Sequence, residues 1–195
     1  MDVIFGKARD GFVDWEGRVA PRVDAAGAYL FGAILHRAQM PNSDFSLAGL
    51  STAILTEVDF TGVTLARASM RDVCGEGGRF DRADMFGVDA KDSSFAGASF
   101  RQARLVGGVF FGTDFTGADF SGADVRGADL RGTTLEARQL MGAFVDAGTL
   151  LDPEVWNEVL PSAEARAAFR VVLAADPRGG LLVELLDMAD RVTGS

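Results

Sequence analysis

Large apolar residues recur at every fifth position along most of the chain. From residue 30 to residue 150, each multiple of five is Leu, Met, Phe or Val, except Gly75 and Ala90. A small residue, most often Ala, lies two positions before many of these residues, and Gly recurs two positions after them. The stretch TGADFSGADVRGADLRGTTL, residues 116–135, contains four successive copies of this five-residue unit. Self-similarity at a fixed period is typical of repeat architectures.

A period of five fits neither the 3.6-residue turn of an α-helix nor the two-residue repeat of a β-strand. Within one unit, however, the small and the large residue are two positions apart, so a short extended segment points both side chains the same way. Gly and polar residues then turn the chain, because Gly adopts backbone angles that other residues resist. Repetition of this unit predicts an all-β solenoid whose coils pair like neighbouring strands and contact only the adjacent coils.

The units ADFSG, ADVRG and ADLRG in residues 118–132 are close to the pattern A(D/N)LxX, and the chain therefore resembles the pentapeptide-repeat family. The resemblance covers residues 26–150 and implies a right-handed quadrilateral β-helix with four units in each coil. About six coils fit, which corresponds to a rod about 30 Å long at the spacing of neighbouring strands. Residues 1–25 match the period poorly, and we interpret them as a degenerate first coil that caps the N-terminal end.

Folding the sequence at 20 residues per coil places four phenylalanines in one interior column. We expect these residues to stack as an aromatic ladder in the core: Phe60, Phe80, Phe100 and Phe120. The coil from 71 to 90 carries Gly75 and Ala90 at inward positions instead. Because a small inward residue leaves part of a layer empty, we expect this coil to be the least well filled.

Helical periodicity replaces the five-residue period near the C-terminal end. Arg138 interrupts a unit, and we expect a short helical turn over residues 136–141. The stretch DPE at 152–154 is typical of a helix start, and two further amphipathic helices are expected behind it. Residues 151–195 therefore form a helical segment that either caps the last coil or joins two chains as a homodimer. Its apolar stripe supplies the candidate dimer contacts: Leu182, Leu185 and Leu186.

The composition excludes several classes of function. The net charge of −9 and the sequence pI near 4.6 argue against nucleic acid or anionic lipid as a direct partner. The single Cys74 forbids an internal disulfide, and the single His36 excludes a multi-His zinc centre. No catalytic constellation or phosphate-binding motif is visible, so we expect no enzyme activity and no catalytic residue, metal or cofactor. The N-terminal segment lacks the apolar core of a signal peptide, and no stretch reaches the ~18 apolar residues of a membrane span, which predicts a cytoplasmic protein.

Two asymmetries of the predicted surface give candidate contact sites. One face is mostly acidic and is the candidate partner surface: Glu57, Glu76, Asp114 and Glu136, with Arg37 as the opposing charge. The neighbouring face, over the phenylalanine ladder, mixes arginines with aspartates. Asp also precedes many inward residues, where either turn chemistry or an anionic surface explains it. Outward apolar residues form a candidate apolar contact: Phe86, Val106, Val109 and Phe111.

The resemblance also implies a function. The stretch TLLDPEVW, residues 149–156, resembles the MfpA-like branch of the family, which with the Qnr proteins interacts with type II topoisomerases. This implies an acidic rod that mimics DNA, binds DNA gyrase or topoisomerase IV, and inhibits the enzyme or protects it from quinolone-type inhibitors. The chain lacks the loop insertions of Qnr proteins, because its period is uninterrupted between residues 30 and 135. The second hypothesis is a scaffold or adaptor that presents the β-helix to an unknown protein partner.

Overall fold

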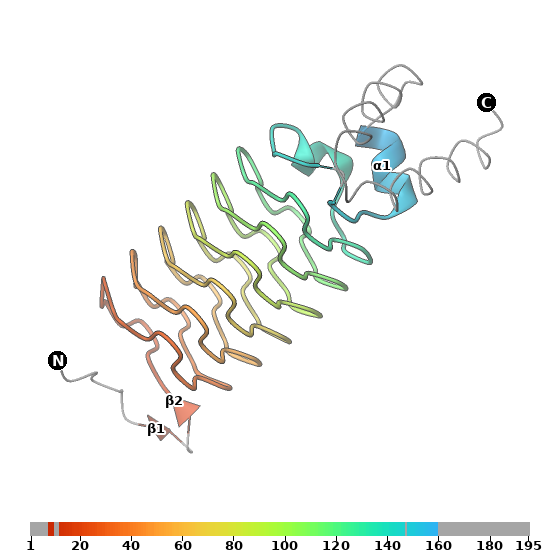
Figure 1. Ribbon diagram of the computed structural model, residues 1–195. Coiled ribbons are helices and arrows are strands. Elements are labelled where there is room, and N and C mark those ends of the chain that lie inside the picture. Colours follow the sequence, from red (N-terminus) through yellow and green to blue (C-terminus); the bar gives the residue numbers. More distant parts are fainter. Residues whose placement is uncertain (1–7, 10–11, 147, 160–195) are drawn as a thin grey trace, which may run out of the picture.

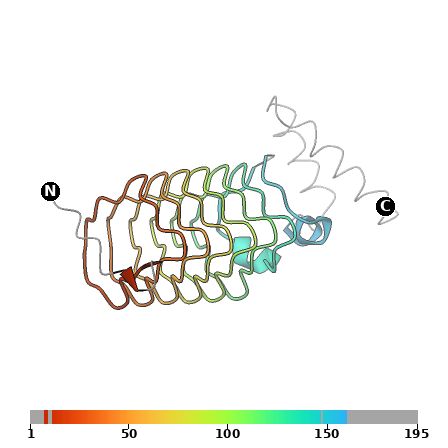
Figure 2. The same cartoon turned by 90° about the horizontal axis from the view of Figure 1, so that it is seen from below.

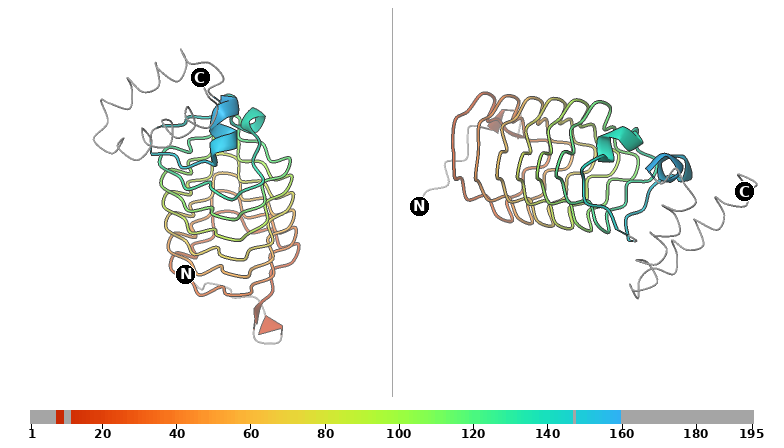
Figure 3. Two further views of the ribbon diagram at one scale, coloured as in Figure 1. Left: turned by 90° about the vertical axis from the view of Figure 1, so that its right-hand side faces the viewer. Right: turned by 90° about the horizontal axis from the view of Figure 1, so that it is seen from above.

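The computed structural model describes residues 8–9, 12–146 and 148–159, and its main body is a rod of stacked coils (Figure 1). Isolated parallel bridges join each coil to the next, beginning with the pair Asp14 and Ile34. Up to the pair Asp124 and Phe144, the two partners are always 20 residues apart. One coil therefore contains four five-residue units, and the chain builds a four-sided β-helix. Figures 2 and 3 show the coils following one another along a single axis.

In the described part of the chain, helices and paired strands occur only at the two ends of the rod. At one end, β1 (Ala8–Arg9) pairs antiparallel with β2 (Phe12–Val13). At the other end lie the 3-10 helix η1 (Ala137–Leu140) and the helix α1 (Pro153–Val159), which begins at the expected DPE stretch (Figure 1). The two further helices expected from the sequence fall outside the described residues, and so do the candidate dimer contacts: Leu182, Leu185 and Leu186.

Each five-residue unit consists of a very short extended segment followed by a tight turn. In one such unit Val63 and Leu65 are buried, and Thr64 between them forms the bridge. The N–H of Leu65 donates to the carbonyl of Asp84 in the next coil at 2.7 Å. The N–H of Thr64 donates to the carbonyl of Ser43 in the preceding coil at 2.9 Å. Because the backbone bonds alternate in this way between two neighbouring coils, equivalent inward side chains lie directly above one another.

The turn between units requires a residue in the left-handed conformation. From residue 17 to residue 132, every residue two positions after an inward one has a φ between 55° and 73°. We call these the corner residues; thirteen are Gly and eleven are not. Gly adopts this conformation without steric cost, so its recurrence in the sequence reflects a requirement of the backbone. The other corners, such as Thr52, hold the conformation at a cost of about 1–2 kcal/mol each.

Four fully buried phenylalanines occupy one column of the core: Phe60, Phe80, Phe100 and Phe120. The Phe100 ring stacks between those of Phe80 and Phe120, at centroid distances of 5.1 and 5.2 Å and interplanar angles of 11°. Phe95 and Phe115, from the adjacent column, meet the Phe100 ring edge-on at 5.5 and 5.7 Å. The middle of the rod is therefore a continuous aromatic core.

The inward Gly75 leaves no empty layer. A Cβ atom at this position would lie 2.6 Å from Cδ1 and Cε1 of Phe95, so the Phe95 ring already occupies the space. The expectation of a poorly filled coil is therefore wrong at Gly75. The size of the inward residue in one coil does not by itself predict how well that coil is filled, because a large ring in the adjacent coil can occupy the space left by a missing side chain.

The five-residue phase slips at the C-terminal end of the rod. The helix η1 replaces one unit, with Leu140 buried and Arg138 exposed. Beyond it, Asp129 pairs with Leu150, which is 21 residues away rather than 20. One extra residue has entered this coil, and Leu151 is buried in place of the inward residue Leu150 that the period predicted.

At the N-terminal end, the ladder of bridges starts at Asp14, ahead of the expected boundary at residue 26. Trp15 is buried, and its ring meets that of Phe45 edge-on at 6.5 Å. The large indole therefore covers the first aromatic ring of the core from the N-terminal side.

Replacement of Phe100 by Ala is expected to lower the free energy of unfolding by about 3–5 kcal/mol, because it empties the middle of the stacked column. The matched variant Met70→Leu roughly conserves volume at another buried inward position, and its cost is expected to stay below about 1.5 kcal/mol. Urea unfolding of both variants measures the difference. A larger loss for Met70→Leu than for Phe100→Ala would contradict the packing described above.

Two substitutions at corners test the backbone constraint by itself. Gly97 has a φ of 65°, and a Cβ added there would meet no atom within 4 Å, so Gly97→Ala is expected to destabilise by about 1 kcal/mol through backbone strain alone. Thr52→Gly relieves the strain of a β-branched corner, offset in part by the greater freedom of Gly in the unfolded chain, and is expected to stabilise by about 0.5–1 kcal/mol. Equilibrium unfolding is expected to give changes of opposite sign in the free energy of unfolding for the two variants. Changes of the same sign would contradict the left-handed strain assigned to the corners.

Candidate protein-binding surfaces

Half of the predicted acidic face is neutralised by arginines. Glu57 forms a bidentate ion pair with Arg37, whose Nε and Nη2 donate to the carboxylate at 2.8 and 3.3 Å. This pairing lowers the pKa of Glu57 and raises that of Arg37. Glu136 likewise lies 2.5 Å from Nε of Arg138. These two carboxylates therefore present little net charge to a partner.

The other two predicted acids differ from each other in role. Asp114 accepts hydrogen bonds from the hydroxyl of Thr134 at 2.6 Å, and from the hydroxyl and the N–H of Thr116 at 2.7 and 2.9 Å. These bonds favour its ionised form and lower its pKa. Asp114 therefore presents a negative charge and also stabilises the turn at Thr116. Glu76 is half-buried and has no ion-pair or hydrogen-bond partner for its side chain among the described residues.

Two further acids border this face at its corner, and the sequence analysis missed them. Asp72 and Asp92 are exposed corner residues with φ of 56° and 55°, one coil apart. Neither forms an ion pair within the described chain; the nearby Arg71 is held by Asp89, with Nη2 at 2.6 Å from Oδ2. An acid two positions after an inward residue was the signal available in the sequence. Four acids of this face and its corner thus form no ion pair, and we call them the central acidic group: Asp72, Glu76, Asp92 and Asp114.

The neighbouring face mixes charges, as its sequence indicated. Arg101 donates through Nε to Asp119 at 2.6 Å, and Arg79 lies 3.6 Å from Asp59 and 3.8 Å from Asp81. The hydroxyl and the N–H of Ser121 also donate to Asp119, at 2.6 and 2.9 Å. Hydrogen bonds from Ser121 first, and from Arg101 second, lower the pKa of Asp119 to about 2.

The candidate apolar contact does not form one bare patch. The half-buried Phe86 ring lies beneath the guanidinium groups of Arg104 and Arg67, at 4.5 and 6.0 Å from its centroid. Val106 and Val109 are half-buried, and Phe111 alone among the four is strongly exposed, at 48%. Cation–π contacts of this kind stabilise a surface aromatic residue within its own chain. Phe86 is therefore partly covered and is a weaker contact than its outward position suggested.

The most exposed aromatic residue of the described chain, Tyr29, lies elsewhere and stacks on a second exposed ring. Tyr29 is 82% exposed and Phe31 44% exposed, and their rings stack at 6.3 Å with an interplanar angle of 15°. Leu47, a corner residue, is 64% exposed. The sequence signal for this pair was a large apolar residue on each side of the inward Leu30. At the opposite end of the rod, Met141 is 79% exposed.

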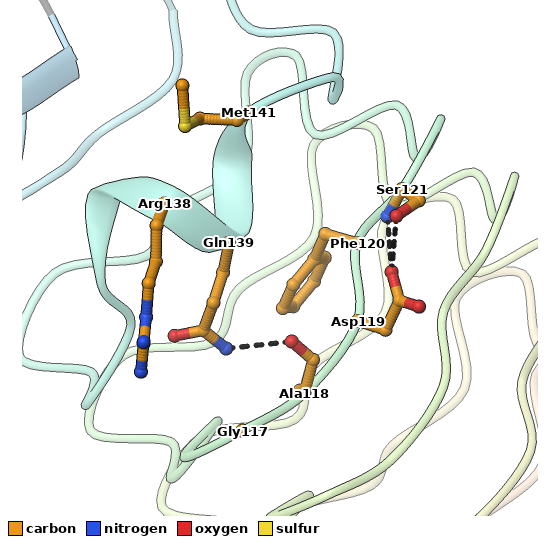
Figure 4. A pocket seen from close by; sticks show the side chains of 8 residues that line it. All are labelled: Gly117, Ala118, Asp119, Phe120, Ser121, Arg138, Gln139 and Met141. Atoms are coloured by element: carbon orange, nitrogen blue, oxygen red, sulfur yellow. Dashed lines mark hydrogen bonds between the residues drawn. The ribbon is translucent and has the colours of Figure 1, made fainter.

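A hollow of about 320 Å³ lies where η1 leaves the ladder (Figure 4). In Figure 4 the Gln139 side chain points from η1 toward the preceding coil, where its Nε2 donates to the carbonyls of Phe115 and Ala118, both at 2.8 Å. Gln139 thereby replaces a backbone bond that the interrupted ladder no longer makes. The hollow lies beside this contact, and its charged groups already have partners, since Asp119 accepts from Ser121 and Arg138 pairs with Glu136.

Within the described residues, no group of three or more His, Cys, Asp or Glu side chains is placed to hold a metal ion. His36 has a partner of its own, since its Nδ1 lies 2.7 Å from Oγ1 of Thr56. No helix in the described part of the chain is long and apolar enough to cross a membrane.

Comparison with known proteins identifies the repeat. The model of pentapeptide repeats matches residues 93–132 as eight copies, in the same phase as the corners and inward positions described above. Residues 93–132 are pentapeptide repeats. The four units per coil seen in the structure agree with the quadrilateral β-helix that the resemblance to this family implied. No curated protein matches the chain.

Three solved structures of pentapeptide-repeat or related proteins are similar to this chain. HetL, which is involved in heterocyst differentiation regulation in the cyanobacterium Nostoc sp. strain PCC 7120, is 24% identical over 72% of this chain and 73% of HetL, with a TM-score of 0.36. A pentapeptide-repeat protein of the Arabidopsis thaliana thylakoid lumen is 25% identical over 65% of this chain and 74% of its own, with a TM-score of 0.38. A trypsin-treated variant of QnrB1, a plasmid-mediated fluoroquinolone resistance protein, is 19% identical over 76% of this chain and 88% of its own, with a TM-score of 0.37.

The lowered pKa of Asp119 predicts an acid-sensitive contribution to stability. The ionised form is favoured in the folded state, so the contribution is complete above the ordinary pKa of 3.8 and is lost as the pH falls toward 2. Asp119→Asn removes this titration, so its unfolding midpoint in urea is expected to fall less than that of the wild type between pH 4.5 and 2.5. Glu154→Gln, an exposed acid on α1, serves as the control and is expected to follow the wild type. Parallel pH profiles for Asp119→Asn and the wild type would contradict the assignment.

Proposed function

We propose that this protein is an acidic rod that binds a type II topoisomerase, DNA gyrase or topoisomerase IV, in place of DNA and modulates its activity. The observation that carries the proposal is the central acidic group, whose carboxylates have no arginine or lysine partner in the described chain: Asp72, Glu76, Asp92 and Asp114. Unpaired carboxylates on one face leave their field open to a basic partner. A cleft that normally holds DNA is positively charged and attracts such a face over about a Debye length, ~10 Å at 0.1 M salt.

Charge density sets how closely the rod imitates DNA. Double-stranded DNA carries about one negative charge per 1.7 Å of its axis, or about 18 charges along 30 Å. The net charge of this chain is −9, so a rod of about that length has about half the charge density of DNA. With fewer charges, the affinity depends more on where the unpaired carboxylates lie. We therefore assign the contact to the central acidic group rather than to the net charge of the whole chain.

The competing function is a scaffold or adaptor for another protein, and one observation favours it. The stacked pair Tyr29 and Phe31 presents an exposed aromatic surface on the N-terminal part of the rod, with the exposed Leu47 from the following coil. Exposed aromatic side chains are enriched where proteins contact one another. An adaptor of this kind would need neither the central acidic group nor a basic partner.

The double substitution Asp72→Asn and Glu76→Gln tests the topoisomerase proposal. It removes two unpaired charges while leaving the Asp114 turn intact, and Asn tolerates the left-handed corner, as Asn42 does elsewhere in the rod. Binding to purified DNA gyrase, measured by surface plasmon resonance, is expected to weaken about tenfold. Supercoiling assays with and without a fluoroquinolone report the accompanying change in inhibition or protection.

The matched control is Glu154→Gln with Glu158→Gln, which changes the net charge equally at exposed positions of α1. This variant is expected to bind gyrase within about twofold of the wild type, because the charges removed lie away from the central acidic group. Equal weakening in both double variants would indicate attraction to net charge alone. No gyrase binding by the wild type would leave the adaptor function, whose own variant is Tyr29→Ser with Phe31→Ser.

A further inference from the structure

A cationic hollow lies on the mixed-charge face, beside the acidic one. Neighbouring coils form a hollow of about 250 Å³ there, lined by six residues: Thr61, Arg79, Asp81, Arg82, Arg101 and Gln102. Three arginines and one aspartate belong to the lining, in a chain whose net charge is −9. Asp59 and Asp119, outside the lining, lie beside Arg79 and Arg101, so Arg82 carries the unpaired positive charge. Local concentration of one sign of charge in a hollow raises the local concentration of the opposite ion. The hollow is therefore suited to a small anion.

The arginines of the hollow retain unused hydrogen-bond donors. The Arg82 guanidinium has no ion-pair or hydrogen-bond partner among the described residues. Arg79 lies 3.6 and 3.8 Å from the nearest carboxylate oxygens, which is too far for hydrogen bonds. Arg101 donates through Nε to Asp119 and makes no side-chain hydrogen bond through its Nη atoms. Unused N–H groups of three guanidinium ions thus border one hollow.

The nearby aspartates also accept hydrogen bonds from groups other than the arginine side chains. Oδ1 of Asp81 accepts hydrogen bonds from the hydroxyl of Ser99 and from the N–H of Arg101, the latter at 3.2 Å. Oδ1 of Asp59 accepts from the hydroxyl and the N–H of Thr61 at 2.6 and 3.0 Å. These bonds fix each carboxylate against the backbone. Because the Oδ1 atoms are held in this way, the arginines keep N–H donors for an incoming oxyanion.

We propose that this hollow binds a phosphoryl group, as the dianion of a phosphate monoester. Arg82 supplies an unpaired positive charge, and planar guanidinium groups bind phosphate oxygens in a bidentate manner. The site involves none of the central acidic group and is independent of the proposed topoisomerase binding. It gives the rod a second surface with a ligand of its own.

An NMR titration of the amide resonances with inorganic phosphate at pH 8 and constant ionic strength tests the site. Saturable shifts are expected at residues 79–82 and 101–102. Arg82→Gln and Arg79→Gln are each expected to raise the apparent dissociation constant about tenfold. Gln is a tolerated corner residue, because Gln102 occupies the equivalent corner one coil further along, with a φ of 57°.

The control is Arg22→Gln, at the equivalent corner three coils earlier. Arg22 is exposed and has a φ of 61°, but Pro21, Pro41 and Asn42 stand where the hollow has Asp81, Arg101 and Gln102, respectively. This variant is expected to bind phosphate within about twofold of the wild type. Two further probes define the ligand: phosphoserine is expected to bind as phosphate does, and acetate is expected to give no saturable shift.

Each of four results would overturn the proposal. The first is the absence of saturable shifts with phosphate, and the second is an equal loss of affinity in Arg22→Gln and Arg82→Gln. The third is binding of acetate as strong as that of phosphate, which would show a general attraction to anions. The fourth is binding of inorganic phosphate without phosphoserine, which would exclude a monoester.

Discussion

The left-handed corner at every fifth residue is the constraint on which the rest of the rod depends. It turns the chain onto the next side after a single bridging residue, without a departure between residues 17 and 132. Because turn and bridge alternate at a fixed interval, equivalent residues of successive coils lie in register, and columns such as Phe60 to Phe120 follow. The regular coils end where the constraint fails. The next corner position, Ala137, belongs to η1, and the phase slips by one residue soon afterwards.

The sequence predicted the coil and its columns because one period controls both the backbone and the core. It did not predict compensation between coils: the Phe95 ring fills the space at Gly75, although each residue taken alone suggested a void. Nor did it predict the slip that buries Leu151, because a single added residue inside a turn leaves the local pattern unchanged. Both features depend on how side chains of neighbouring coils pack in three dimensions, which the spacing of residues along the sequence does not determine.

The sequence also did not predict which surface carboxylates are paired with arginines. Counting charges on each face identified an acidic side with Arg37 as its opposing charge, but it did not show that Arg37 pairs with Glu57, or that Arg138 reaches Glu136. Exposed pairs of this kind contribute little to stability, typically below about 1 kcal/mol. Their effect is to decide which carboxylates remain available. The central acidic group consists of acids of this face and its corner that form no ion pair, and the two corner members were not among the strand residues whose charges were counted.

Corner residues also separate the chemistry of the surface from the stability of the core. The corners of this rod include Arg, Asn, Leu, Thr, Glu, Asp and Gln, all with φ between 55° and 61°. One backbone geometry therefore accepts cationic, anionic, amide and apolar side chains, and each points outward without contact to the inward columns. Since the rise between coils is fixed at about 4.8 Å, a substitution at a corner places a charge at a defined step along the rod and leaves the packing unchanged. Asp72 and Asp92 on one edge and Arg82 on another are products of this freedom. An anionic and a cationic surface coexist on the same rod because neither has to be compatible with the core.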